Sequence, residues 1–310
     1  MNFQQEVSLK NYSNYKIGGP AKYFVEVSSV EELKGVIAEA SSLTQRIFIL
    51  GGATNILISD RGFDGLVIHN KIGGITRNED GVEVGSGVLV KDFLEFCIEN
   101  SLSGWEWAGG LPGTMGGAVR GNAGAFRGET KDSVVEVKSL DLKNLTAKRR
   151  TNEECRFGYR NSVFKSGEGK GEFITSVTMK LSLGDKETIR KNIQEKIDYR
   201  NAKHPMEYPN IGSTFKNIPL DSLSKNQQEE FKDIIKTDPF PVVPTTKLLA
   251  LCNLKGKRAG GAMISDKHPN FIVNIDNASS EDVKTLISLA KETVKMKYNI
   301  TLQEEIIYLD

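Results

Sequence analysis

The sequence lacks any long hydrophobic run and has few cysteines and histidines, and each shortage disfavours a class of protein. No segment approaches the ~20 apolar residues of a membrane span, and the first ten residues are too polar for a signal peptide. We therefore expect a cytoplasmic protein. Cys97, Cys155 and Cys252 are far apart, and the three histidines lack metal-ligand spacing. A disulfide framework and metal catalysis are disfavoured, and buried thiols are expected.

The sequence also lacks an excess of charge of either sign. Lys and Arg together number 41 and Asp and Glu number 40, so the net charge is +1. This balance provides no broad field for nucleic acid or a membrane surface, although a local basic site for one small anion remains open. With 310 residues, the chain has room for two or three domains. We expect a small-molecule substrate and no obligatory protein partner.

Hydrophobic patterning predicts a mixture of helices and strands. Ser29 and Glu32 form a possible capping box at the start of a helix, and a helix with Ile189, Ile193 and Ile197 on one face must end before Pro205. Further helices are predicted around 90–98, 247–252 and 283–294, and strands at 47–50, 66–68, 82–84, 173–181 and 302–308. Because these elements do not alternate strictly as βαβ units, we predict an α+β fold.

Glycine is concentrated in two places. Nine of the 30 glycines fall between Gly104 and Gly128, in the stretch GWEWAGGLPGTMGGAVRGNAGAFRG, which is regular neither as helix nor as strand as a whole. The second cluster is LGGATNIL, from Leu50 to Leu57, where a predicted strand enters Gly51-Gly52. Glycine allows a ligand to approach the main chain, and successive N–H groups bind anions. Neither cluster has the spacing of a dinucleotide-binding fingerprint or a P-loop, so we expect two loops that hold one large anionic cofactor.

At this point the sequence resembles a known family. LGGATNIL and GLPGTMGGAVRGNAGAF are similar to the two flavin-pyrophosphate loops of the UDP-N-acetylenolpyruvoylglucosamine reductases. Three more segments are similar to motifs of the same family and occur in its order. They are FGYRNSVFK (157–165), PNIGSTFKN (209–217) and GGAMISDKHPNFIVN (260–274). The glycine loops alone are moderately specific, whereas the five segments together are very specific. The chain resembles the shorter subclass, which lacks a tyrosine-bearing loop.

The resemblance implies a fold and a set of cofactors. It implies a two-part FAD-binding region of the vanillyl-alcohol-oxidase type at 1–200, with subdomains near 1–65 and 66–200 and a last strand, 301–310, that returns to it. A substrate-binding α+β domain is implied for 201–300. FAD is expected to be non-covalent, because neither loop contains His or Cys, and NADPH is the implied electron donor. The implied FAD-binding residues are Gly51, Gly52, Ala53, Thr54, Asn55, Ile56, Leu57, Gly110, Pro112, Gly113, Thr114, Gly116, Gly117, Asn122, Gly124 and Ala125.

The resemblance also implies a reaction and its catalytic residues. The expected activity is reduction of UDP-N-acetylglucosamine enolpyruvate to UDP-N-acetylmuramate, a step of peptidoglycan precursor synthesis. Arg160 is implied as the cation at the substrate carboxylate, Glu305 as its partner and Ser213 as the proton donor. Substrate-binding roles are implied for Lys203, Lys216 and Asn217. Taken singly, each of these residues would be an ordinary surface, turn or capping residue.

The sequence departs from the family pattern in several places. Ala53-Thr54 replaces a Gly-Ser pair, and the final motif is LQEEII where Leu-Glu-Pro-Glu-Val-Arg is common. The adjacent Glu304 therefore competes with Glu305 for the catalytic assignment. Another FAD-dependent oxidoreductase of the superfamily, acting on a sugar or alcohol, is the alternative function. Such an enzyme would share the glycine loops but has no reason to carry the other motifs.

Overall fold

The chain forms two compact units. The computed structural model describes residues 2–40, 42–44, 46–237 and 240–310. Unit 1 comprises Met1–Val7, Ala21–Gly52 and Asp64–Tyr199, and unit 2 comprises Ser8–Pro20, Ala53–Phe63 and Arg200–Asp310. The last boundary lies inside helix α5 (Lys186–Lys203), close to the division near residue 200 that the sequence suggests. The two earlier segments of unit 2 were not anticipated from the sequence.

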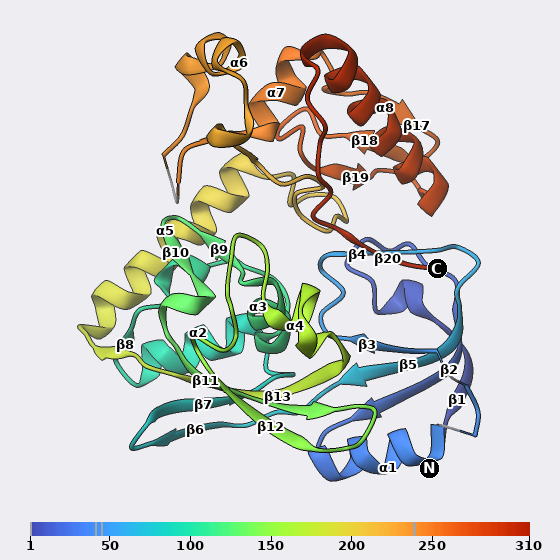
Figure 1. Ribbon diagram of the computed structural model, residues 1–310, viewed down its shortest axis with the longest axis vertical. Helices are drawn as coiled ribbons and strands as arrows, with labels where there is room; N and C mark the ends of the chain where they lie inside the picture. Colours follow the sequence, from blue (N-terminus) through green and yellow to red (C-terminus); the bar gives the residue numbers. More distant parts are fainter. Residues whose placement is uncertain (1, 41, 45, 238–239) are drawn as a thin grey trace. The chain divides into compact units, whose positions relative to one another are not determined.

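A five-stranded antiparallel sheet organises most of unit 1 (Figure 1). Its strands, in spatial order, are β12 (Ala147–Thr151), β11 (Val134–Asp141), β13 (Glu172–Met179), β7 (Gly81–Gly85) and β6 (Ile75–Asn78). The apolar residues of α2 (Val90–Glu99) recur on one face and are buried, as the periodicity predicts. The short helix α3 (Met115–Gly121) contacts β7 and β13. These elements share one hydrophobic core, which also includes Ile189 and Ile193 of α5.

A smaller, four-stranded sheet completes unit 1. Its order is β1 (Gln4–Ser8), β2 (Pro20–Val27), β5 (Phe63–Asn70) and β3 (Ile47–Leu50). β3 and β5 are parallel and are covered by residues of α1 (Val30–Ala40). The predicted capping box at α1 is half formed. Ser29 Oγ accepts the Glu32 N–H, but the Glu32 carboxylate accepts hydrogen bonds from Ser28 instead of Ser29.

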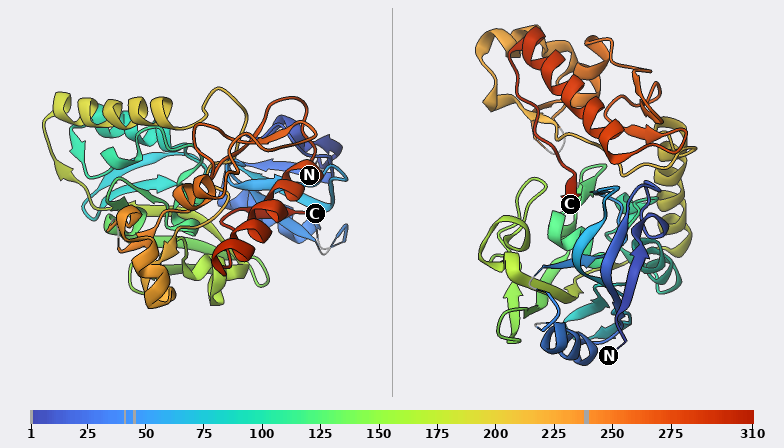
Figure 2. Two further views of the ribbon diagram at one scale, coloured as in Figure 1. Left: turned by 90° about the horizontal axis from the view of Figure 1, so that it is seen from above. Right: turned by 90° about the vertical axis from the view of Figure 1, so that its right-hand side faces the viewer.

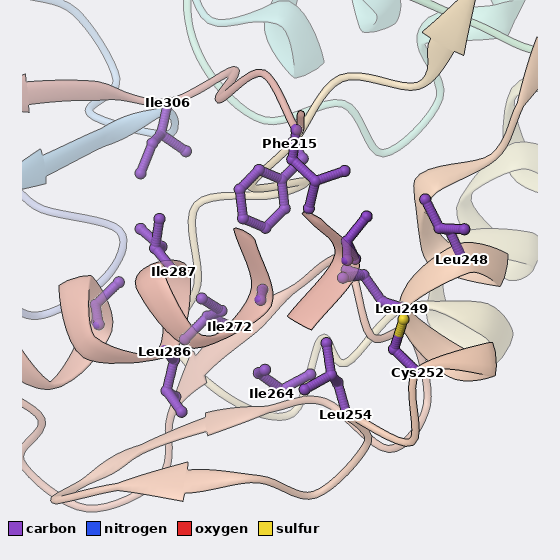
Figure 3. Close-up of a cluster of buried hydrophobic side chains, with 14 of the residues drawn as sticks. Phe215, Leu248, Leu249, Cys252, Leu254, Ile264, Ile272, Leu286, Ile287 and Ile306 are labelled. Carbon is purple, nitrogen blue, oxygen red and sulfur yellow. The ribbon is translucent and has the colours of Figure 1, made fainter. Parts of the chain in front are cut away.

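Unit 2 is built around helix α8 (Ser280–Tyr298), which packs against a three-stranded sheet (Figure 2). The strands of this sheet are β17 (Arg258–Ala259), β18 (Ala262–Ile264) and β19 (Ile272–Asn274). The other elements of unit 2 are β4 (Ile56–Ile58), β15 (Ile218–Pro219), α6 (Lys225–Glu230), β16 (Val242–Val243), α7 (Thr245–Leu251) and β20 (Ile307–Leu309). Phe215 and Ile306 lie in the core cluster with side chains of α7, α8 and the sheet (Figure 3).

The structure confirms the α+β prediction and most of the predicted elements. The glycine-rich stretch is irregular as a whole, but it contains α3 and the two-stranded hairpin of β9 (Gly124–Ala125) and β10 (Gly128–Glu129). The remaining short elements of unit 1 are β8 (Leu102–Ser103), α4 (Val163–Ser166) and β14 (Ser182–Leu183). The last strand is shorter than predicted, because residues 302–306 form only one isolated bridge before β20 begins. β20 pairs in parallel with β4.

Candidate active site

The two glycine loops meet in unit 1. Gly51 follows the end of β3, and a Cβ atom at that position would lie 2.8 Å from Thr114 Oγ1 of the second loop. A real Cβ essentially never comes so close to a non-bonded atom, so the approach of the two loops requires glycine at position 51. The first loop is therefore in contact with Thr114 of the second loop.

The remainder of the first loop belongs to unit 2. Ala53 adopts a positive φ of 48°, and the Asn55 Nδ2 amide donates to the carbonyl of Glu305 at 3.0 Å. Ile56 and Leu57 lie in β4, and both are buried. If Ile56 and Leu57 contact a cofactor, they must therefore do so through the main chain. Asn55 connects the first loop with the C-terminal segment.

The second loop turns at two glycines before it enters α3. Gly110 and Gly113 have φ values of 72° and 110°, which glycine adopts at little cost. Thr114 is the N-cap of α3, and its Oγ1 accepts the Gly117 N–H. The N–H groups of Met115 and Gly116 donate to carbonyls of residues 88 and 86, so they are not available to a ligand. Gly116 is explained by close packing, since its Cβ would lie 2.9 Å from Ser86 Cβ.

The predicted flavin residues fit a large anionic group. The two loops are in contact at Gly51 and Thr114, and Pro112 and Gly117 of the second loop are exposed. The Asn122 side chain is fully buried. Its Nδ2 donates to Glu129 and to the Gly158 carbonyl, and its Oδ1 accepts the N–H of Lys131. Both Nδ2 hydrogens and one lone pair of Oδ1 are thus used inside the protein, and the contact of Asn122 with the cofactor stays a prediction.

Arg160 lies in unit 1, on a tight turn just before α4. Its φ is 54°, and its Nη2 donates to the Gly124 carbonyl of β9 at 2.8 Å. The guanidinium lies 5.3 Å from the centre of the Tyr159 ring, and Lys165 Nζ donates to the Arg160 carbonyl. The backbone and the charged end of Arg160 are therefore both held by neighbouring residues.

Ser213 and Glu305 lie on adjacent antiparallel segments of unit 2. The Glu305 N–H donates to the Thr214 carbonyl at 2.8 Å, and the Lys216 N–H donates to the Gln303 carbonyl at 2.9 Å. Phe215 and Glu304 form the bridge between these bonds. Ser213 is half-buried, whereas its neighbour Thr214 is buried. The backbone pairing therefore places the serine loop beside the glutamate segment.

The two adjacent carboxylates have different surroundings. Glu304 forms an ion pair with Lys291 of α8 at 2.8 Å and accepts a hydrogen bond from the Tyr308 hydroxyl. Burial, followed by the bond to Glu304, raises the pKa of Tyr308, so that its hydroxyl remains a donor. Successive side chains of an extended segment point to opposite faces, so Glu305 is directed away from the side on which Glu304 is held.

The predicted substrate residues are in unit 2 but differ in their exposure and in their hydrogen bonds. Lys203 is exposed at the end of α5, and Lys216 is half-buried beside the glutamate segment. The Asn217 Oδ1 accepts the N–H of Thr245 at the start of α7, so Asn217 has a structural contact in addition to any role in binding. Lys203 and Lys216 retain the exposure that a diphosphate site requires.

The third family motif forms a packed turn in unit 2. His268 stacks edge-on against His204 and Phe271, with ring centres 5.2 and 4.8 Å apart. Burial lowers the pKa of both histidines to about 4, so both are neutral at pH 7. Asn270 donates to the Phe215 carbonyl and accepts the Phe215 N–H. Asn270 of this motif therefore holds the segment that follows Ser213 by hydrogen bonds to Phe215.

Two supporting residues were missed from the sequence. Lys291 holds Glu304 from 13 positions away on a different element, and no local pattern predicts such a pair. Glu129 is a buried carboxylate at the end of the glycine-rich stretch, and its position directly after Gly128 was the available signal. Within the described ranges, no helix is long and apolar enough to span a bilayer. The same residues contain no cluster of three or more potential metal ligands.

Comparison with known families covers both units. Residues 21–144 match the FAD binding domain family, and residues 204–309 match the C-terminal domain of UDP-N-acetylenolpyruvoylglucosamine reductase. The curated reductase of Clostridium tetani is 34% identical over 307 residues, which cover 97% of this chain and 90% of that protein. The reductase of Lactobacillus gasseri is 34% identical over 309 residues, covering 99% and 93% of the two chains.

A solved structure is also similar along the whole chain. The crystal structure of UDP-N-acetylenolpyruvylglucosamine reductase from Thermus caldophilus superposes with a TM-score of 0.77 and 30% sequence identity. The similarity covers 100% of both chains. The fold, including its FAD-binding part and its C-terminal part, is therefore that expected from the sequence motifs.

Proposed function

The chain belongs to the family of UDP-N-acetylenolpyruvoylglucosamine reductases, and we propose that Arg160, Ser213 and Glu305 carry out the chemistry of this family. The enzyme is an FAD-dependent oxidoreductase that uses NADPH to reduce UDP-N-acetylglucosamine enolpyruvate to UDP-N-acetylmuramate in peptidoglycan precursor synthesis. Its substrate is a nucleotide sugar. We further propose that it works in the cytoplasm without an obligatory protein partner. Nothing in the comparisons favours the alternative of a sugar or alcohol oxidase.

The glycine loops are proposed to hold the FAD pyrophosphate mainly through the main chain. Gly51 and residues 110–114 support this role, because their geometry allows close approach and brings the two loops together. When bound, FAD would supply the two-electron redox chemistry between NADPH and the substrate alkene. The protein supplies orientation and electrostatic stabilisation.

The substrate determines what the protein residues must do. It is an enol ether conjugated to a carboxylate, so hydride addition at one alkene carbon drives negative charge onto the other carbon and the carboxylate. Arg160 is proposed to stabilise this charge, because its planar guanidinium matches a carboxylate. Glu305 is proposed as the partner of Arg160 at the same group. The Ser213 hydroxyl then gives its proton to the electron-rich carbon.

One observation carries the assignment of Ser213 and Glu305. The pair of backbone hydrogen bonds from Glu305 to Thr214 and from Lys216 to Gln303 holds the two segments side by side. Thr214 lies directly opposite Glu305, so the segment that carries Ser213 is fixed beside the glutamate segment. Lys216, three residues after Ser213, is proposed to lower the cost of removing the Ser213 proton.

The test separates the two half-reactions. Reduction of FAD by NADPH needs no proton donor at the substrate carbon, so Ser213→Ala should bleach its flavin at near the normal rate. Reoxidation by the enolpyruvate substrate should be slowed by at least ~10²-fold. Stopped-flow absorbance of the flavin measures both steps.

Thr214→Val is the matched control, because it removes the neighbouring hydroxyl and should spare reoxidation. If Ser213→Ala slowed only the NADPH step, the proton-donor assignment would be wrong. A larger loss of reoxidation in Thr214→Val than in Ser213→Ala would lead to the same conclusion.

A further inference from the structure

Three residues with unfavourable backbone angles lie near Arg160, whose own φ is also positive. Asn122, Phe126, Arg127 and Arg160 have φ values of 44°, 50°, 67° and 54°. The left-handed conformation is unfavourable for a residue other than glycine, and asparagine tolerates it best. Such strain persists only where the surroundings determine the conformation, and it is concentrated at functional sites.

The β9–β10 hairpin contains two of these residues. β9 and β10 pair from Ala125 to Gly128, which leaves Phe126 and Arg127 as a two-residue turn. Such turns with two positive φ angles usually carry Asn-Gly. Here residues of α5 stabilise the turn. The Phe126 ring packs edge-on against Tyr199 at 5.2 Å and lies 5.5 Å from Lys196 Nζ.

The hairpin meets the Arg160 guanidinium at Gly124. The Gly124 carbonyl accepts from Arg160 Nη2 at 2.8 Å. A Cβ atom at Gly124 would lie 2.8 Å from Glu129 Cγ and 3.3 Å from Arg160 Nη1. The stem of Glu129 and the guanidinium therefore occupy the space that a side chain at position 124 would need. A displacement of Glu129 should therefore shift Gly124, and with it the guanidinium of Arg160.

Asn122 connects Glu129 with the loop that carries Arg160. The Asn122 Nδ2 donates to Glu129 Oε2 at 3.2 Å and to the Gly158 carbonyl at 3.0 Å. Gly158 lies two residues before Arg160. Both side chains are buried, with Asn122 fully inaccessible and Glu129 only 7% exposed. The Asn122 amide thus connects the Glu129 carboxylate of the hairpin with the turn that carries Arg160.

We propose that Glu129 and Asn122 are positioning residues for Arg160. The inference rests on the proposed catalytic role of Arg160. The guanidinium must be in place before charge develops on the substrate, because stabilisation comes from preorganised groups. Glu129 acts by accepting the Asn122 hydrogen bond and by packing against Gly124, not by contacting the substrate.

The test is a double-mutant cycle on the flavin-loaded enzyme. Glu129→Ala should slow flavin reoxidation by the enolpyruvate substrate by roughly 10–100-fold, since a displacement of about 1 Å can cost 10²-fold. Reduction by NADPH and the flavin absorbance spectrum should be unchanged. The double variant Glu129→Ala/Arg160→Ala should be no slower than Arg160→Ala, because Glu129 acts only through Arg160.

Two conservative variants keep the test decisive if Glu129→Ala folds poorly. Glu129→Gln keeps an acceptor for Asn122 at the same reach but loses the ion pair with Lys131. Glu129→Asp keeps the charge but shortens the reach. Positioning predicts that Glu129→Gln is the faster of the two in reoxidation, and the reverse order would overturn the proposal.

The control is Glu83→Ala, which removes a carboxylate paired with Lys138 on the sheet of the same unit. Its reoxidation rate should be normal even if its melting temperature falls. Additive losses in the double variant, or normal reoxidation in Glu129→Ala beside an impaired Arg160→Ala, would overturn this inference alone. Normal reoxidation in Arg160→Ala would instead overturn the proposed role of Arg160, and the inference with it.

Discussion

Near the C-terminus, two residues of the same type differ in the contacts that their surroundings give them. Glu304 and Glu305 are neighbours in sequence, but only Glu304 has its carboxylate held by Lys291 and Tyr308. A carboxylate held in this way stabilises the fold and is poorly placed to follow a changing charge on a substrate. The carboxylate of Glu304 is thus already engaged within unit 2, and Glu305 stays the proposed catalytic glutamate.

This difference predicts opposite outcomes for two matched variants. Glu305→Gln should strongly slow substrate reduction. Glu304→Gln should reduce the free energy of unfolding by about 1–3 kcal/mol, because charge-assisted hydrogen bonds are lost, but should spare the rate. Stopped-flow kinetics and thermal melts of both variants measure these effects. Slow catalysis in Glu304→Gln with a normal Glu305→Gln would show that the C-terminal motif is misaligned by one residue.

At the scale of elements, one carboxylate joins neighbouring strands of the five-stranded sheet by hydrogen bonds. Glu172 of β13 accepts hydrogen bonds from Arg150 of β12, Ser139 of β11 and Lys148. Burial by itself would raise the pKa of Glu172, but these donors outweigh it and lower the pKa to about 2. Three neighbouring strands are therefore joined by a group that must be ionised.

This network predicts a loss of stability in acid. The folded-state pKa lies below the ordinary value of 4.5, so the stabilisation is complete above pH 4.5 and is lost as the pH falls toward 2. Glu172→Gln should unfold more easily at pH 7, by roughly 1.5–3 kcal/mol, and should show a flatter pH dependence between 4.5 and 2. Urea titrations over this pH range measure both changes.

Glu136→Gln is the control for this prediction. Glu136 lies on β11 and pairs with the exposed Arg149 at 3.7 Å, a type of surface pair that contributes about 0–1 kcal/mol. An acid dependence in Glu172→Gln equal to that of the unaltered protein would show that other groups cause it.

At the scale of the whole molecule, unit 2 depends on segments from the first 63 residues. Tyr15, Ile17 and Leu57 are each about 1% exposed and belong to the core that α8 and the small sheet form. Tyr15 also donates its hydroxyl hydrogen to the Ile272 carbonyl, and β4 supplies the partner strand of β20. Residues 201–310 therefore do not contain the complete hydrophobic core of unit 2.

We accordingly predict that residues 201–310 do not fold alone. Each missing core side chain removes about 1.5–3 kcal/mol of burial energy, and the whole stability of a domain is only about 5–15 kcal/mol. A circular-dichroism melt should show no cooperative transition for this fragment. In the full chain, Leu57→Ala should cost about 2–5 kcal/mol, whereas Leu183→Ala, at a 74% exposed position, should cost little. A sharp transition in the fragment would contradict this prediction.

The sequence alone determined the features that depend on local pattern. The periodicity of α2 and α5, the strand before Gly51 and the order of five motifs follow from residues close together in the chain, and they sufficed for the α+β class, the cofactor and the family. Local backbone preference and side-chain spacing act over a few residues, so they can be recognised without the rest of the molecule.

Only the tertiary structure decided which side chains are already engaged. Asn122 stands in a cofactor motif, yet its amide is used by Glu129, Gly158 and Lys131. Glu304 is occupied by Lys291 of another element, and residues 8–20 and 53–63 join the C-terminal part of the chain. These outcomes depend on contacts between residues far apart in sequence. Burial forces each polar group to find whichever partner the fold brings within reach, and no local pattern specifies that partner.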